Sequence, residues 1–202
     1  MDNQRSSILG EFKSQISTLL GLVMLLWTIE IVDQFVFSGF LDQWFGIRPR
    51  TIPGLWGIAF APFLHGSFGH LISNTLPLVT LGWLVMLRRT SDWFVVSAIT
   101  ALCSGLGTWL IGASYSTHIG ASGVIFGYFG FLLLRGYFER SFVAIAFSIV
   151  VTVLYGGMLL GTVPFLNAPN ISWEGHLFGF LGGVLSAWLL ADREGDYPSG
   201  VS

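Results

Sequence analysis

Long apolar runs separated by short polar stretches make up most of the chain. Six apolar segments can be drawn, at about residues 16–37, 70–87, 93–111, 122–134, 142–160 and 174–191. The hydrocarbon core of a bilayer is about 30 Å thick, so a helix needs about 20 apolar residues to cross it. All the segments except the fourth approach this length. The pattern predicts an all-α membrane protein, a bundle of six transmembrane helices.

The fourth segment is short and begins at a serine. It runs from Ser122 to Leu134 and stops at Arg135, which gives a helix of roughly 20 Å at 1.5 Å per residue. If Arg135 marks one membrane surface, Ser122 lies roughly 10 Å below the other. The preceding stretch, ASYSTHIG, must then dip irregularly into the membrane, which requires a protein interior or a water-filled cavity. We expect a short central helix that carries a hydroxyl at the floor of a wet cavity.

Composition supports a membrane domain with little chain outside the bilayer. The 202 residues are 53% hydrophobic and 10% charged, against about 25% charged in soluble domains. The net charge of -2 gives no indication of a nucleic-acid partner, and the single cysteine, Cys103, fits inert packing. We expect a cytoplasmic N-terminal segment at 1–15, a six-helix domain at 16–191 and a cytoplasmic tail at 192–202.

Basic residues predict the orientation. With six spans, seven of the nine fall on one side, which the positive-inside rule makes cytoplasmic; they are Arg5, Lys13, Arg88, Arg89, Arg135, Arg140 and Arg193. Only Arg48 and Arg50 fall on the other side. We expect a multi-pass protein, in the plasma membrane, with both termini cytoplasmic.

Polar residues from three segments reach nearly one depth. Counted from the nearest basic residues, Asn74 lies roughly 21 Å, Ser122 roughly 20 Å and His176 roughly 25 Å above the cytoplasmic surface. His70 shares a helical face with Asn74, one turn above it. Polar residues from separate apolar segments at one depth in the membrane indicate a functional site.

Small residues predict which helices pack together. Gly175, Gly179 and Gly183 are spaced by four in the sixth segment, and Gly123 and Gly127 have the same spacing in the fourth. Such faces let membrane helices approach closely, and packing them would bring Ser122 to His176.

The residue types fit nucleophilic catalysis. Serine needs a base to take its proton, and histidine is the usual one; no acid stands below His176 in its segment, which favours a Ser–His dyad. Attack on an amide creates an oxyanion that needs donors, and the Ser122 backbone N–H, Asn74 and His70 are candidates. Ser122 or His176 alone would be interpreted as a helix cap or a satisfied polar contact. We expect no metal and no cofactor, because the HExxH pattern of zinc proteases is absent.

Three spaced motifs resemble the rhomboid family of intramembrane serine proteases: PFLHGSFGHLISN in the second segment, GASG opening the fourth and HLFGFLGG in the sixth. The resemblance implies Ser122 as nucleophile, His176 as base, and His70, Asn74 and the Ser122 N–H as oxyanion donors. Gly120, Gly123, Phe126 and Gly179 would support them. It implies cleavage of single-span proteins of the lipid bilayer in or near the outer part of their transmembrane segments.

Two positions depart from the family pattern. Many members have Trp-Arg in the first loop, where this chain has Trp56-Gly57, and Arg48 or Arg50 is a possible substitute. Many also stack a tyrosine on the catalytic histidine, where this chain has Phe126. His65 matches a family position that favours a structural hydrogen bond.

Other interpretations remain open. A catalytically silent relative would bind membrane proteins without cutting them, although it would be expected to lack the serine or the histidine. A small transporter could use the cavity, although no internal repeat is visible.

Glu30 and Asp33 lie one turn apart late in the first segment, and we expect them to bond loop backbone near the outer surface. Residues 161–172 form a candidate lid over the cavity.

Overall fold

The computed structural model describes residues 2–87, 89–140, 142–166 and 171–191, and within these ranges the chain is helical without a strand. Its long helices are α1 (Asp2–Val32), α4 (Phe68–Met86), α5 (Thr90–Ile111), α6 (Ser122–Glu139), α7 (Phe142–Tyr155) and α8 (Trp173–Ala191). Among the described residues, five helical stretches are long and apolar enough to cross a membrane: Ile8–Phe37, Phe68–Met86, Thr90–Ile111, Phe142–Thr162 and Trp173–Ala191. The all-α membrane bundle predicted from the sequence is confirmed.

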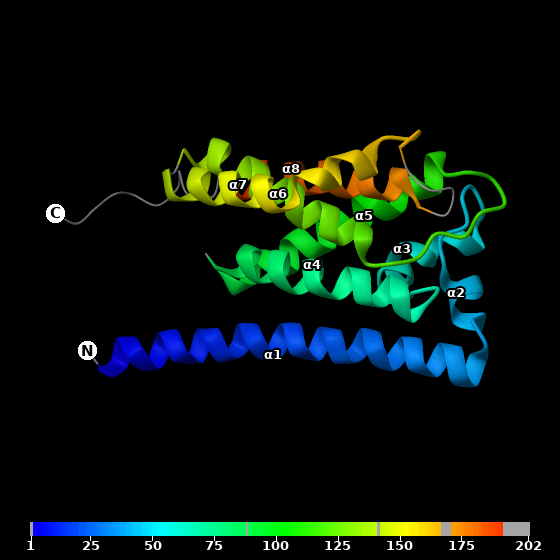
Figure 1. Ribbon diagram of the computed structural model, residues 1–202, viewed down its shortest axis with the longest axis horizontal. Coiled ribbons are helices and arrows are strands. Elements are labelled where there is room, and N and C mark those ends of the chain that lie inside the picture. The colour runs from blue at the N-terminus through cyan, green and yellow to red at the C-terminus, as the bar shows by residue number, and fades with distance from the viewer. Residues whose placement is uncertain (1, 88, 141, 167–170, 192–202) are drawn as a thin grey trace.

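The helices lie side by side along one long axis, and α1 starts at the same end of the bundle at which α8 finishes (Figure 1). Helix α1 lies at the edge of the bundle and packs chiefly against α4. It begins well before the expected residue 16. Helix α6 is central and contacts α4, α5, α7 and α8, as expected for the segment that carries the serine.

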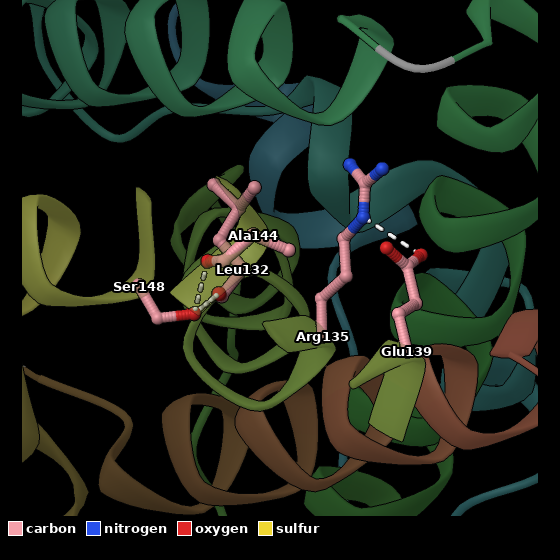
Figure 2. Close-up of polar contacts among 5 residues, drawn as sticks. All are labelled: Leu132, Arg135, Glu139, Ala144 and Ser148. Atoms are coloured by element: carbon pink, nitrogen blue, oxygen red, sulfur yellow. Dashed lines mark hydrogen bonds and ion pairs between the residues drawn. The ribbon is translucent and has the colours of Figure 1, made fainter. Parts of the chain in front are cut away.

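Two helices end differently from the sequence expectation. Helix α6 continues one turn beyond Arg135 to Glu139, and an ion pair of 2.8 Å between these two side chains holds that turn (Figure 2). Helix α7 ends at Tyr155, and the chain continues as the 3-10 helix η4 (Gly156–Thr162). Two consecutive glycines after Tyr155 explain this end, because glycine disfavours the interior of an α-helix.

The first loop is structured rather than extended. After a π-helical turn, η1 (Asp33–Phe37), it forms α2 (Phe40–Phe45), η2 (Pro53–Leu55), α3 (Gly57–Phe60) and η3 (Ala61–Phe63). Arg50 ties it to the end of α5, where its guanidinium donates to the Leu110 carbonyl at 3.0 Å and to Ser114 Oγ at 2.6 Å. Gly57 has no room for a Cβ, which would overlap the backbone of Ile47. This contact explains why glycine follows Trp56.

The glycines of α6 and α8 form a close seam. A Cβ at Gly179 would overlap the Gly123 carbonyl oxygen, and one at Gly183 would overlap the Gly127 carbonyl oxygen. These helices pack more extensively against each other than any other pair. The expected glycine face is therefore where the two backbones meet, with Ser122 and His176 near the N-terminal ends of the two helices.

Helix α7 is the least buried of the apolar helices. Val151 is its one buried residue, and it packs chiefly on α6. The Ser148 hydroxyl lies 2.7 Å from the Leu132 carbonyl of α6 and 3.0 Å from the Ala144 carbonyl of its own helix (Figure 2). A Cβ at Gly136 of α6 would meet the α7 backbone, at 2.6 Å from Ile145 N. Helix α7 is thus attached to the bundle along one narrow line.

Candidate active site

Ser122 and His176 are in direct contact. Ser122 is the first residue of α6 and His176 lies in the first turn of α8. Ser122 Oγ and His176 Nε2 are 2.9 Å apart, a hydrogen-bonding distance. The glycine seam sets this distance, because it lets the starts of the two helices approach.

A backbone carbonyl determines which ring nitrogen of His176 carries the proton. Nδ1 lies 3.0 Å from the Gly161 carbonyl oxygen of η4. A carbonyl oxygen can only accept, so Nδ1 must carry the proton in this contact. In the neutral ring, Nε2 is then an acceptor and Ser122 donates to it. The contact leaves His176 in the tautomer that a general base requires.

Phe126 fixes the plane of the imidazole. Its ring is parallel to that of His176, with an interplanar angle of 6° and a centroid distance of 4.0 Å. The phenyl ring therefore provides the stacking surface expected at this position, without a hydroxyl. A Cβ at Gly161 would lie 2.7 Å from Phe126 Cζ and 3.3 Å from His176 Nδ1, so only glycine leaves both rings in place.

The side chains of His70 and Asn74 converge on Gly120. A Cβ at Gly120 would lie 2.7 Å from His70 Cε1, 2.8 Å from His70 Nε2 and 3.6 Å from Asn74 Nδ2, and this residue has a φ of 116°. Its backbone conformation and its surroundings therefore both require glycine. The His70 and Asn74 side chains of α4 therefore lie beside Gly120, which precedes Ser122 by two residues.

Asn74 offers a hydrogen-bond donor without an acceptor. Its side chain is 6% exposed, and Nδ2 has no hydrogen-bond partner among the described residues. A buried, unpaired donor costs stability in a resting protein. A developing negative charge beside Ser122 would be a favourable partner for it, together with the N-terminal N–H groups of α6, which lack intrahelical acceptors.

The site opens into a cavity of about 750 Å³. Its lining comes from α4, from residues 117–119 before α6, and from α6, η4 and α8. The lining residues include His70, Asn74, Ser122, Phe126, Met158, Ser172 and His176. A cavity with the Ser122 hydroxyl in its wall is therefore present at the expected place. The candidate lid borders it through Ile171 and Ser172, whereas residues 167–170 of that loop lie outside the described part.

A smaller cavity lies on the other side of Ser122. It has about 30 Å³, room for about one water molecule, and its polar lining includes Ser104, Thr108, His118 and Ser172. The Ser104 hydroxyl donates to the Gly175 carbonyl at 2.9 Å. Sequence reasoning missed these α5 residues, although a serine and a threonine spaced by four in an apolar helix were a visible signal. It also missed Gly161, which acts through its backbone and has no side-chain signal.

His65 lies beside the site in a buried position. Its ring is edge-on to that of His70, with centroids 5.1 Å apart. Burial, and secondarily the neighbouring His70, lower the pKa of His65 to about 4, and the Phe63 backbone opposes this only in part. Neither ring nitrogen has a hydrogen-bond partner in the described part of the chain, so the structural hydrogen bond expected of His65 is not found. His65 is therefore neutral near pH 7 and supports His70 as a packed neighbour.

The acids at the end of α1 are away from the serine. The Asp33 carboxylate accepts from the Leu41 N–H at 2.9 Å and from the Asp42 N–H at 3.3 Å, which confirms its expected bond to loop backbone. Glu30 is 1% exposed and its oxygens have no hydrogen-bond partner in the described part of the chain, so the bond to loop backbone expected of Glu30 is not found. Burial, with Asp33 and Glu30 nearby, raises the pKa of Asp42 to about 7.

The fold and the site define an integral, multi-pass membrane protein whose cavity holds a serine and a histidine in contact. Residues 53–193 match the sequence model of the Rhomboid domain. The chain belongs to the rhomboid family, and this membership implies intramembrane protease activity.

Similar proteins come from bacteria and plants. The chain is 45% identical over 184 residues to an uncharacterized protein of Mycobacterium tuberculosis, covering 88% of this chain and 76% of that one. It is 26% identical over 182 residues to the putative rhomboid protease YdcA of Bacillus subtilis, covering 89% of each. Rhomboid-like protein 11 of Arabidopsis thaliana, a chloroplastic protein, is 29% identical over 161 residues, covering 70% of this chain and 55% of that one.

Proposed function

We propose that this protein is a serine endopeptidase that cleaves single-span membrane proteins with a Ser122–His176 dyad. The observation that carries the proposal is the 2.9 Å contact between Ser122 Oγ and His176 Nε2, in a ring whose Nδ1 faces the Gly161 carbonyl. A serine becomes nucleophilic when an adjacent base is oriented by a third group. Here a backbone carbonyl takes the place of the acid of a triad.

The reaction begins when Ser122 Oγ attacks the scissile carbonyl and His176 Nε2 takes its proton. His70, Asn74 and the Ser122 backbone N–H then stabilise the oxyanion of the tetrahedral intermediate. The protonated His176 gives its proton to the leaving amine, and an acyl-enzyme remains on Ser122. Removing one such donor typically costs about 10²- to 10³-fold in kcat.

Hydrolysis of the acyl-enzyme needs water at the same serine. His176 takes a proton from a water molecule, the hydroxide attacks the ester carbonyl, and Ser122 leaves with the proton. Water reaches the site through the larger cavity, and the water-sized cavity beside Ser104 and Thr108 can hold one molecule within the bundle. No metal or cofactor takes part in these steps.

The substrates are membrane proteins whose helix unwinds at the outer end. The site lies at the start of α6, and the cationic residues place the other end of this helix on the cytoplasmic side. Both termini are then cytoplasmic, residues 1–15 and 192–202 flank the six-helix domain, and the protein resides in the plasma membrane. A helix hides its peptide bonds in internal hydrogen bonds, so the cut falls in or near the outer part of the substrate's span.

The proposal is tested by labelling with a fluorophosphonate, which reacts with activated serines. The purified full chain should be labelled at Ser122, as located by mass spectrometry, and His176→Ala should reduce the labelling rate strongly. Ser186→Ala is the matched control, because the Ser186 hydroxyl bonds the Gly182 carbonyl of its own helix and lines neither cavity beside Ser122. Equal labelling in His176→Ala would show that this histidine is not the base.

A further inference from the structure

A hydrogen bond between two hydroxyl groups joins α7 to α4. Thr80 Oγ1 and the Tyr155 hydroxyl oxygen are 2.5 Å apart. The Thr80 hydroxyl also lies 2.9 Å from the Leu76 carbonyl of its own helix. Since it has one proton and the carbonyl can only accept, Tyr155 donates to Thr80. The bond therefore links the outer half of α7 to the helix that carries His70 and Asn74.

Tyr155 stands directly before the turn that contacts the base. It is the last residue of α7, and η4, which follows it, presents the Gly161 carbonyl to His176 Nδ1. The part of α7 that precedes it packs on α6 and is joined to it by the Ser148 bond to the Leu132 carbonyl (Figure 2). Ser148 lies two helical turns before Tyr155, so the bond to Thr80 is the polar attachment nearest to η4 on the α7 side.

We propose that Thr80 and Tyr155 are positioning residues for the catalytic base. Their hydrogen bond holds the end of α7 against α4, and so keeps the Gly161 carbonyl on the Nδ1 proton of His176. The inference rests on the proposed Ser122–His176 dyad. It adds that a hydrogen bond outside the cavity determines which ring nitrogen of His176 carries the proton.

The consequence of losing this bond follows from the two forms of neutral imidazole. When Gly161 accepts from Nδ1–H, Nε2 is free to take the Ser122 proton. When the carbonyl moves away, the form with the proton on Nε2 becomes populated, and that form cannot act as a base toward Ser122. The fraction of active enzyme falls while the cavity and the nucleophile remain, so kcat decreases and KM changes little.

The test uses Tyr155→Phe and Thr80→Val, each of which removes one side of the bond and keeps the shape of the side chain. Thr80→Ser retains the acceptor and should restore the behaviour of the wild type. Tyr137→Phe is a matched control, because Tyr137 is 75% exposed. Thr152→Val is a second control, because the Thr152 hydroxyl bonds the Ser148 carbonyl within α7.

Two quantities are measured on the full chain in detergent: the kcat and KM for a single-span test substrate, and the ¹⁵N signals of the His176 ring. The ring signals report which nitrogen is protonated, without any substrate, and His176→Ala identifies them. We expect Tyr155→Phe and Thr80→Val each to lower kcat by roughly 5-fold, as for one neutral hydrogen bond. The double variant should be no slower than either single one, and the ring should shift toward mixed tautomers.

A second pair of variants acts on the turn itself. Gly161→Ala places a methyl group against Phe126 and His176, whereas Gly157→Ala places one where no atom lies within 4 Å. Gly161→Ala should reproduce the change in the ring signals and Gly157→Ala should not.

Unchanged kcat in Tyr155→Phe and Thr80→Val would overturn the inference. A lower kcat with unaltered ring signals would also overturn it, because the bond would then act on something other than the tautomer. A higher kcat/KM with unaltered ring signals would assign the bond to substrate access instead. A wild-type chain with the expected ring signals that cleaves no test substrate would count against the proposed function and not against the positioning bond.

Discussion

Gly179 of α8 lies so close to the carbonyl oxygen of Gly123 on α6 that a Cβ at Gly179 would overlap it. Gly183 stands in the same relationship to Gly127, one turn further along both helices. The two backbones can therefore meet at the N-terminal ends of both helices, where Ser122 contacts His176. The spacing of the active site depends on the absence of side chains in this seam.

Replacing Gly179 should therefore damage both stability and activity. Gly179→Leu forces α6 and α8 apart, and overpacking of this kind costs roughly 1–3 kcal/mol or more. Thermal unfolding in detergent should show the loss, and proteolysis should fall to background. Gly21→Leu is the matched control, because a Cβ at Gly21 of α1 meets nothing within 4 Å. Normal activity in Gly179→Leu would mean that the seam does not set the dyad.

The unpaired amide of Asn74 predicts a loss of activity without a loss of stability. Asn74→Ala should cut kcat by on the order of 10²-fold, as for other oxyanion donors, and should leave the melting temperature unchanged or raised, since an unsatisfied buried group is removed. Thr75→Val is the control, because the Thr75 hydroxyl bonds the Leu71 carbonyl of its own helix. A kcat equal to that of the wild type would exclude Asn74 from the oxyanion site.

Phe126 should contribute through the surface of its ring. Phe126→Leu removes the stacking partner of His176, which is worth about 0.5–1.5 kcal/mol in aromatic pairs, and should lower kcat by roughly 2- to 10-fold. Phe126→Tyr keeps the ring and should stay close to the wild type. Steady-state cleavage of a test substrate checks both. Equal activity of the leucine variant would show that the imidazole does not need the stack.

The raised pKa of Asp42 predicts a pH-dependent stability. Its pKa is about 7 in the folded chain against a usual value of 3.8, chiefly through burial and then through Asp33 and Glu30. The folded state therefore binds a proton that the unfolded state releases between these values, so the contribution of Asp42 to stability falls as pH rises toward 7. Asp42→Asn removes this loss.

We expect Asp42→Asn to raise the melting temperature at pH 8 by roughly 2–4 °C, the shift that about 1 kcal/mol produces in a chain of this size. At pH 3, below both pKa values, the carboxyl group is neutral in the folded and in the unfolded chain, and the two proteins should differ least in melting temperature. The measurement is thermal unfolding of both at the two pH values. A gain of the same size at pH 3 would contradict the raised pKa of Asp42.

The pattern of apolar segments predicted the helical bundle, because helix length in a membrane follows from bilayer thickness. It did not predict the end of α6, where the pair of Arg135 with Glu139 adds a turn, nor the change to a 3-10 helix after Tyr155. These helix ends depend on local side-chain pairing and on contacts with neighbouring helices. The pattern of apolar residues carries no information about either.

The side chains of the candidate site could be selected from the sequence, because Ser122, His176, His70 and Asn74 are polar residues at one depth of apolar helices. The contact between Ser122 and His176 and the convergence of His70 and Asn74 on Gly120 agree with that selection. The Gly161 carbonyl and the bond between Thr80 and Tyr155 could not be selected. Every residue has a carbonyl, and only the packing of η4 beside α8 determines which of them meets the base.

The most direct test of the central claim is cleavage of a single-span substrate by the purified protein and by Ser122→Ala, with mass spectrometry of both fragments. We expect one cut by the wild type in the outer part of the substrate's span or just outside it, and no cut by Ser122→Ala. The same cut in Ser122→Ala would show that the serine is not the nucleophile. A cut in the cytoplasmic half would contradict the orientation of the chain or the depth of Ser122.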